Sequence, residues 1–518
     1  MKETKTATAK SLVKLASGFS FGVLVSRIMG LVREIIYATL FGASAGMDAF
    51  RTAYIIPGLI LEFISEGTMN AAFIPVFSDL HKSKGKQCAL SFALNLFNIL
   101  LVLSFILMIL LILFAPGIVK ILAGGYSFEK QMLTVKLVRM LFPILVLSSL
   151  ISLVMGILNY YRHYPITGLA PAMWNLVTIG ITWIGFNFYR SRGLETSYAL
   201  GLGIVLGAVA EFLFMIPTLY REGFRYRWTF NLNSPHLKKV LMLFIPVALG
   251  YVATRINVAI NQAVATHMGE GSVSHYSYAF RLMSFPLGII GVSLATVTLP
   301  EAARYASSRR TDLVCSILIK TLRLAMFFVF PVCCLMWLLR FHIVRIIFQH
   351  RAFLPGDTVA TGAILGWFLI GIIGASSTKI MANIFFSLKD TKSPVIISFI
   401  SSIINIIAVF LLTRSMGING LSLAVSIASI FGAVLLVLTF HVKFSPLPFK
   451  LLWEGLFKVI MATLLPVIIY IPWLQLFEPS ELKLIQSLLI VVVVSATYLP
   501  FYLILARLMN FKVSHPEK

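Results

Sequence analysis

Long apolar stretches recur along the whole chain and constrain its fold more than any other feature of the sequence. Residues 90–116 contain no charged residue, and 485–507 contain none before Arg507 at their end. A helix needs about 20 mainly apolar residues to cross the hydrocarbon core of a bilayer. By this criterion the sequence predicts about fourteen spans, near 15–40, 50–78, 90–116, 134–158, 166–188, 196–219, 238–266, 276–302, 313–338, 359–387, 394–413, 418–440, 452–474 and 485–507. We therefore expect an all-α polytopic membrane protein.

The composition supports this fold class. Of the 518 residues, 59% are hydrophobic and 12% are charged, whereas about 25% are charged in ordinary soluble proteins. A soluble chain of this length could not bury so much apolar surface. This excludes a cytosolic enzyme, a disordered scaffold and a secreted disulfide framework. The four cysteines have no CxxC spacing and are interpreted as buried thiols: Cys88, Cys315, Cys333 and Cys334.

The net charge of +24 comes from 43 Lys and Arg against 19 Asp and Glu. In a soluble chain it would indicate a nucleic-acid partner. Here alternate loops carry most of the basic residues, which predicts cytoplasmic loops facing anionic lipid and no nucleic acid. The N-terminal segment lacks the cleavage site of a secretory signal, so we interpret it as the first permanent span. An even number of spans then places both termini in the cytoplasm.

A long-period repeat divides the chain. Arg27 stands 24 residues before Arg51, which ends an Ala-Phe-Arg triplet, and Arg255 stands 26 residues before Arg281, which ends another. Two halves of about six spans, offset by roughly 230 residues, fit this pattern. Similar halves packed about a central cavity are a common transporter plan.

Charged residues inside the predicted spans are the candidate functional residues. They are Arg27, Arg33 and Glu34 in the first span, Asp48, Arg51, Glu62 and Glu66 at or in the second, Arg255 and Arg281 in the matching spans of the second half, and Lys379 in the tenth. Such residues are costly in lipid and usually face a partner or a watery cavity.

Two interpretations of these charges stay open. In the first, Arg33 pairs with Glu66 or Arg51 with Asp48, and the ion pairs hold helices together. In the second, a surplus of guanidinium groups faces a cavity and binds an anion, because Arg matches phosphate oxygens with paired hydrogen bonds. Helix breakers occur in the same spans, at Pro57, Gly58, Pro286 and Gly288. They are interpreted as hinges, with close helix packing as the alternative.

Motifs of catalysis are missing from the sequence. There is no GxxxxGK[ST] loop and no HExxH motif, and His236, His342 and His350 are interpreted as interfacial or solvated residues. We expect no enzyme activity, no metal and no cofactor. A membrane enzyme acting on lipid diphosphates stays as a minor alternative.

Several motifs, in order, resemble one family. The segment 26–34 reads SRIMGLVRE, and it is followed by Phe41-Gly42-Ala43, Asp48-Ala49-Phe50, Glu66-Gly67, Ala72-Phe73-Ile74-Pro75, Gly156-Ile157-Leu158-Asn159, Ala170-Pro171, Asn175, Arg281-Leu282-Met283, Phe285-Pro286-Leu287-Gly288, Leu299-Pro300 and Lys389-Asp390-Thr391-Lys392. These motifs resemble the MurJ (MviN) family, the bacterial lipid II flippases. The resemblance covers most of the chain and weakens over the last two spans.

The resemblance implies a fold of the multidrug/oligosaccharidyl-lipid/polysaccharide exporter (MOP) superfamily. It implies an N-terminal lobe over 1–228, a C-terminal lobe over 229–445, and two extra helices with a cytoplasmic tail over 446–518. The implied task is to move the undecaprenyl-diphosphate-linked peptidoglycan precursor, lipid II, across the bacterial inner membrane by alternating access. Membrane lipids and cell-wall synthesis proteins are the further partners expected. The last two helices would border a groove for the lipid tail.

The resemblance also implies roles for particular residues. Arg27, Arg33 and Arg281 would bind the diphosphate and sugar, with Asp48 and Glu66 as supporting polar residues. The chain departs from the family pattern at Leu61, where an Arg is common, and at Ser284, where an acidic residue is common. We expect Arg51 and Arg255 to compensate as extra cavity cations, and Glu34 and Lys379 to support or gate the site. A flippase for another polyprenyl-diphosphate-linked glycan, or a drug/cation antiporter of the superfamily, are the alternatives.

Overall fold

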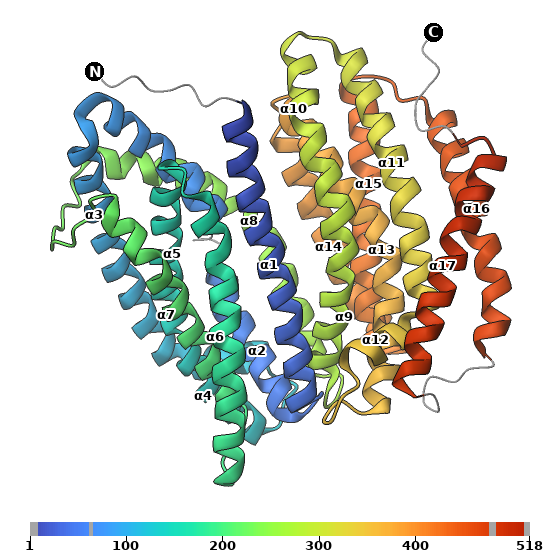
Figure 1. Ribbon diagram of the computed structural model, residues 1–518, viewed down its shortest axis with the longest axis horizontal. Helices are drawn as coiled ribbons and strands as arrows, with labels where there is room; N and C mark the ends of the chain where they lie inside the picture. Colours follow the sequence, from blue (N-terminus) through green and yellow to red (C-terminus); the bar gives the residue numbers. More distant parts are fainter. Residues whose placement is uncertain (1–8, 62–65, 476–482, 512–518) are drawn as a thin grey trace. The chain divides into compact units, whose positions relative to one another are not determined.

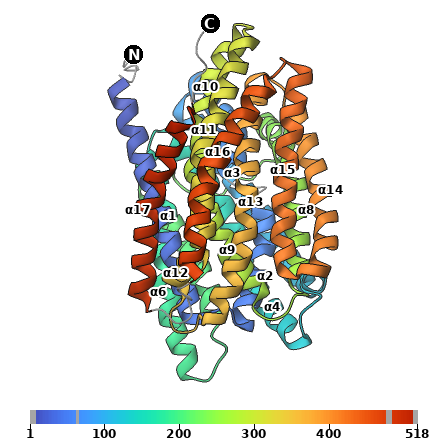
Figure 2. The same ribbon diagram turned by 90° about the vertical axis from the view of Figure 1, so that its right-hand side faces the viewer.

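The structure is a computed structural model that describes residues 9–61, 66–475 and 483–511. Regular structure in these ranges is helical (Figures 1 and 2). The α-helices are α1 Ala9–Phe41, α2 Ala45–Leu61, α3 Glu66–Leu122, α4 Phe128–Leu141, α5 Pro143–Tyr160, α6 Tyr164–Ser191, α7 Tyr198–Arg221, α8 Pro235–Ala265, α9 Ser272–Pro286, α10 Ser293–Ser307, α11 Thr311–Leu338, α12 Arg340–Phe348, α13 Pro355–Ser387, α14 Lys392–Met416, α15 Ile418–Lys443, α16 Phe449–Gln475 and α17 Leu484–Leu508, with one π-helix, η1 Leu287–Val292. The expected all-α polytopic fold is confirmed.

Eleven helical segments in the described residues are long and apolar enough to cross a membrane. They account for most of the predicted spans, with α4 and α5 forming one of them and α9, η1 and α10 another. The predicted spans 15–40, 50–78 and 238–266 fall instead on α1, on α2 with the start of α3, and on α8. These helices carry the arginines and carboxylates discussed above.

Contacts group the chain into two compact units, residues 1–255 and 256–518. In unit 1, α6 packs between α1 and α7, and α3 packs against α5 (Figure 1). The crossing of α1 and α6 needs glycine on both helices, because a Cβ placed on Gly22 would lie 2.6 Å from the carbonyl carbon of Gly168. Close approach through small residues is how helices associate in lipid.

Helix α3 is two helices joined at a sharp bend. Gly85 sits at the bend with φ 85° and ψ 172°, a left-handed conformation that favours glycine. The bend separates residues 66–84 from the long apolar part of α3, so the apolar stretch predicted at 90–116 lies wholly on the second arm.

In unit 2, α13 is the central helix and packs against α9, α11 and α15 (Figure 2). Its contact with α15 is tight at Gly374, where a Cβ would lie 2.5 Å from the backbone nitrogen of Ile430. Pro286 ends α9, and Gly288 follows in η1, so this predicted hinge coincides with a change of helix type. Pro57 and Gly58 lie inside α2, which continues to Leu61 as a helix. Hinge motion at either place stays a prediction.

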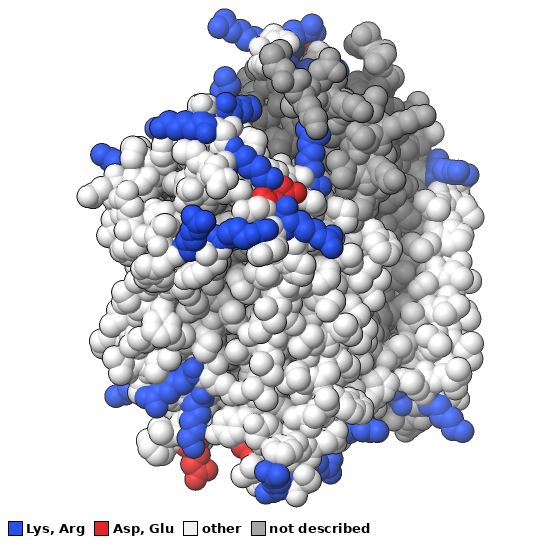
Figure 3. Space-filling view, turned by 60° about the vertical axis from the view of Figure 1, so that its left-hand side comes forward, with Lys and Arg blue, Asp and Glu red and all other residues white. Residues whose placement is uncertain are grey.

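The cysteines and the surface charges follow the membrane pattern. Cys315 and Cys333 are buried, and Cys88 and Cys334 are half-buried, all as free thiols. On the face drawn in Figure 3, Lys and Arg gather at two opposite ends and leave an uncharged belt between them. A belt of this kind fits contact with lipid tails.

Candidate functional site

Three of the predicted residues form one buried ionic cluster in unit 1. Arg33 and Glu34 follow each other on α1, with 6% and 0% of their surface exposed. Nη2 of Arg33 donates to Oε1 of Glu34 at 3.1 Å. Arg51, on α2, donates from its own Nη2 to the other carboxylate oxygen, Oε2. The two guanidinium groups therefore share a single carboxylate, and we call Arg33, Glu34 and Arg51 the α1–α2 cluster.

Aromatic rings cover this cluster. The guanidinium carbon of Arg33 lies 5.6 Å from the ring centre of Tyr37 and 5.7 Å from that of Trp174, on α6. Arg51 lies 5.8 Å from the same Tyr37 ring. A cation above an aromatic face is stabilised by the ring quadrupole, most strongly where water is excluded.

The α1–α2 cluster has a formal charge of +1, from two arginines and one glutamate. Its hydrogen bonding is also incomplete, since Nε of Arg33 and the hydroxyl of Tyr37 are buried with no partner among the described residues. Buried polar groups are usually hydrogen-bonded, and each exception calls for an explanation. A buried arginine with a spare donor is suited to bind an anion.

A second ion pair lies on α2 and α4. The side chain of Asp48 is fully buried, and Nζ of Lys130 donates to its Oδ2 at 2.8 Å. Tyr126 supports the pair: its hydroxyl donates to the backbone carbonyl of Asp48 at 3.2 Å, and its ring centre lies 4.1 Å from Nζ of Lys130. Sequence reasoning found Asp48 but missed Lys130, because nothing in the sequence indicates that α4 packs on α2.

The other predicted residues are spread over several helices. Arg27, on α1, is exposed, and Arg255, on α8, is half-buried. In unit 2, Arg281 on α9 and Lys379 on α13 are both exposed. Glu62 and the side chains of Leu61 and Glu66 lie outside the described residues. The ion pair suggested between Arg33 and Glu66 therefore stays a prediction.

Ser284, which departs from the family pattern, is bonded within its own helix. Its hydroxyl donates to the backbone carbonyl of Phe280 at 2.8 Å. A serine that bonds back one turn does not call for a partner on another helix. The absence of an acidic residue at this position therefore leaves no unpaired group there.

Unit 2 contains a polar contact that the sequence reasoning missed. Nδ2 of Asn405, on α14, donates to Oδ1 of Asn257 at 3.1 Å and to Oδ1 of Asn261 at 3.0 Å, both on α8. Three asparagines inside two predicted spans are the signal that could have found it. Within the described ranges there is no group of three or more His, Cys, Asp and Glu side chains that could hold a metal ion.

Comparison with solved structures defines the class of protein. An inward-facing multidrug resistance MATE family transporter of the MOP superfamily superimposes with a TM-score of 0.69 over 81% of this chain and 94% of that chain. At 14% identity this likeness shows the fold alone. Lipid II flippase MurJ in an inward closed conformation superimposes with a TM-score of 0.77 at 26% identity, over 94% of this chain and 98% of that one. This chain therefore shares the polytopic helical fold of these two solved structures.

Sequence comparison then gives the family. A sequence profile described as lipid II flippase MurJ matches residues 37–493. A probable lipid II flippase MurJ from Rhizobium tropici is 30% identical over 434 residues, covering 83% of this chain and 81% of its own length. One from Buchnera aphidicola subsp. Acyrthosiphon pisum is 31% identical over 401 residues, covering 76% and 77%. The chain belongs to the lipid II flippase MurJ family, and the resemblance seen in the sequence is confirmed.

Proposed function

We propose that this chain moves lipid II from the inner to the outer leaflet of the bacterial cytoplasmic membrane by alternating access. Family membership supports the substrate, because the relatives and the solved structure of similar fold are named as lipid II flippases. The observation that carries the chemistry is the α1–α2 cluster, in which the buried Arg33 keeps an unused Nε donor. A diphosphate is the part of lipid II that such a group can bind.

We assign the predicted residues as follows. Arg33 and Arg51 bind the diphosphate, and their shared carboxylate, Glu34, fixes both guanidinium groups. Arg27, Arg255 and Arg281 complete the cationic surface of the cavity, while Asp48, Glu66 and Lys379 support or gate it. Pro57, Gly58, Pro286 and Gly288 are the hinges. Arginine suits the binding role because its fork meets two phosphate oxygens at once.

The same proposal covers topology. The two lobes are 1–228 and 229–445, and 446–518 add two helices that border a groove for the lipid tail. Both termini lie in the cytoplasm. Support comes from one end of unit 1, where Lys86 pairs with Glu222 at 3.0 Å and Lys239 with Asp79 at 2.9 Å. These pairs bring three basic segments together, and basic segments stay in the cytoplasm.

Transport of this kind needs no covalent step, so we propose that the chain is a transporter without enzyme activity and without a cofactor. Transport depends on differential binding: the cavity binds the diphosphate in the inward-open state and releases it in the outward-open state. The membrane potential acts on any net charge that crosses, at about 2.3 kcal/mol per elementary charge per 100 mV.

Growth complementation tests the function. In a bacterium depleted of its own lipid II flippase, the full chain is expected to restore growth, and an empty vector is not. Immunoblotting of membranes confirms that the chain is present. Lysis despite normal membrane levels would contradict lipid II as the substrate and would favour another polyprenyl-diphosphate-linked glycan.

A further inference from the structure

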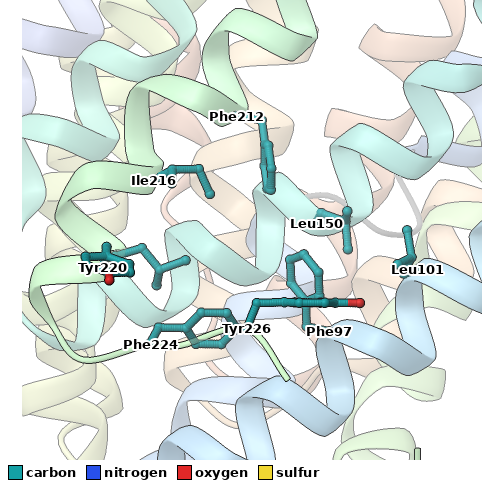
Figure 4. A pocket seen from close by; sticks show the side chains of 9 residues that line it. Phe97, Leu101, Leu150, Phe212, Ile216, Tyr220, Phe224 and Tyr226 are labelled. Atoms are coloured by element: carbon teal, nitrogen blue, oxygen red, sulfur yellow. The ribbon is translucent and has the colours of Figure 1, made fainter. Parts of the chain in front are cut away.

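Unit 1 contains an apolar pocket far along the chain from the ionic cluster (Figure 4). Its volume is about 430 Å³, within the roughly 300–1,000 Å³ usual for ligand sites. Phe97 and Leu101 of α3, Leu150 of α5, and Phe212 and Ile216 of α7 form its walls. None of these side chains offers a hydrogen bond, so the pocket suits a hydrocarbon chain.

The open side of the pocket is bordered by an extended segment that follows α7. Phe224 and Tyr226, in this segment, complete the lining. Two buried asparagines of α3 hold the segment in place. Nδ2 of Asn98 donates to the carbonyls of Arg227 and Thr229 at 3.0 and 2.9 Å. Asn95 exchanges two hydrogen bonds with the backbone of Asn231, at 2.9 and 2.6 Å. The wall is therefore fixed by hydrogen bonds although it is not helical.

Every second side chain of this segment is large, apolar and exposed. Tyr226, Trp228, Phe230 and Leu232 are between 45% and 63% exposed, and the rings of Trp228 and Phe230 stack at 6.5 Å. Tyr and Trp concentrate at the level of lipid headgroups, where a ring can be half in hydrocarbon and half in water. We infer from this alternation that the segment, and the pocket opening beside it, lie at the interface of the membrane.

Positive charge surrounds the mouth. The guanidinium carbon of Arg225 lies 3.2 Å from the ring centre of Tyr220, a lining residue, and its Nη1 donates to the carbonyl of that tyrosine. Arg221 and Arg227 are exposed beside it in sequence. The neighbouring carboxylate, Glu222, is already engaged by Lys86 and by Nε2 of His163 at 2.7 Å. The three arginines therefore present positive charge at headgroup level.

We propose that this pocket binds one acyl chain of an anionic phospholipid, whose phosphate is held by Arg225 and Arg227. An apolar pocket, an aromatic belt and flanking arginines occur together, and an anionic phospholipid matches all three. A neutral lipid would bring no net negative charge to these arginines. The site is separate from the α1–α2 cluster and takes a lipid that is not transported. By the topology proposed above the site faces the cytoplasmic leaflet, but the binding of the lipid does not depend on that topology.

Lipid binding to the purified full chain tests the proposal. The delipidated protein is titrated with dioleoyl-phosphatidylglycerol or dioleoyl-phosphatidylcholine, and bound lipid is counted by native mass spectrometry. We expect one phosphatidylglycerol to bind about tenfold more tightly than phosphatidylcholine, because each basic residue near a membrane surface adds severalfold to anionic-lipid affinity. The combined change Arg225→Gln and Arg227→Gln should bring the two affinities within about twofold. Leu101→Trp, which fills the pocket, should weaken both lipids about tenfold by removing the space for the chain.

Matched variants separate this site from general lipid contact. Leu103→Trp makes the same change two residues along α3 at a position that is 61% exposed, and it should leave binding unchanged. Arg190→Gln with Arg192→Gln removes two exposed arginines that also lie over aromatic rings, and it should leave the preference intact. If the Arg225 and Arg227 variant unfolds, raising NaCl from 50 to 500 mM on the unaltered chain must reduce the preference instead. Equal binding of both lipids to the unaltered chain, or full binding to Leu101→Trp, would overturn the proposal.

Discussion

Glu34→Gln is expected to destabilise the protein by about 3–5 kcal/mol, the usual cost of removing one partner from a buried ion pair. Glu34 is fully buried and is the carboxylate shared by Arg33 and Arg51. Glutamine keeps the size of the side chain but removes its negative charge. The two guanidinium groups would then stay buried without the carboxylate that they share. A loss of this size should also lower the amount of protein in the membrane several-fold.

Thermal unfolding of the purified chain and its abundance in membranes measure this effect. Glu222→Gln is the matched control, because Glu222 also binds two basic side chains, Lys86 and His163, but at an end of unit 1 where 20% of its side chain is exposed. Partial burial acts to raise the pKa of Glu222, but the hydrogen bonds from His163 and Lys86 outweigh it and keep the pKa below its ordinary value. Exposed pairs contribute about 0–1 kcal/mol. Equal losses in the two variants would contradict the buried cluster.

Arg33→Ala is expected to cause a large loss of function with a smaller loss of stability than Glu34→Gln. Removing Arg33 leaves Glu34 paired with Arg51. One cation and its spare Nε donor are lost from the cluster. We expect purified protein to bind lipid II about 10- to 100-fold more weakly, the range for losing a charge-assisted hydrogen bond. Arg33→Lys should fall between, because it keeps the charge without the planar fork.

Arg190→Ala serves as the control for Arg33→Ala, since it removes an exposed arginine from α6. It should leave both lipid II affinity and thermal stability unchanged. If Arg33→Ala binds lipid II as tightly as the unaltered chain, the α1–α2 cluster is an ion pair that only holds helices together, the first of the two interpretations drawn from the sequence.

The fold could be predicted from the sequence because each membrane-spanning helix is determined mainly by the length and apolar character of its own stretch of sequence. A stretch such as 90–116 is too long and too apolar for anything but a buried or lipid-facing helix, and it lies on the long second arm of α3. The charged spans were the least distinct, since arginines and carboxylates interrupt the apolar stretches that form α1 and α2, and arginine those that form α8 and α9. The repeat of arginines matched these spans between the two halves.

The partners within the site depend on packing and could not be predicted. Glu34 and Arg51 are 17 residues apart, and Asp48 and Lys130 are 82 apart. Which carboxylate meets which cation follows from how α1, α2 and α4 pack, and the sequence allowed several pairs. The pocket was missed for a similar reason. Arg221, Arg225 and Arg227 belong to the basic loops, which the sequence analysis used only to predict orientation, while the pocket depends on Asn95 and Asn98 fixing the segment beside them.

The amount of lipid II in the outer leaflet tests the central claim most directly. It would be measured in cells depleted of their own flippase and supplied with the unaltered chain, with Arg33→Ala at equal protein level, or with an empty vector. The account predicts that the unaltered chain restores outer-leaflet lipid II and that Arg33→Ala stays near the empty-vector level. Outer-leaflet lipid II that is equal for Arg33→Ala and the unaltered chain would contradict it.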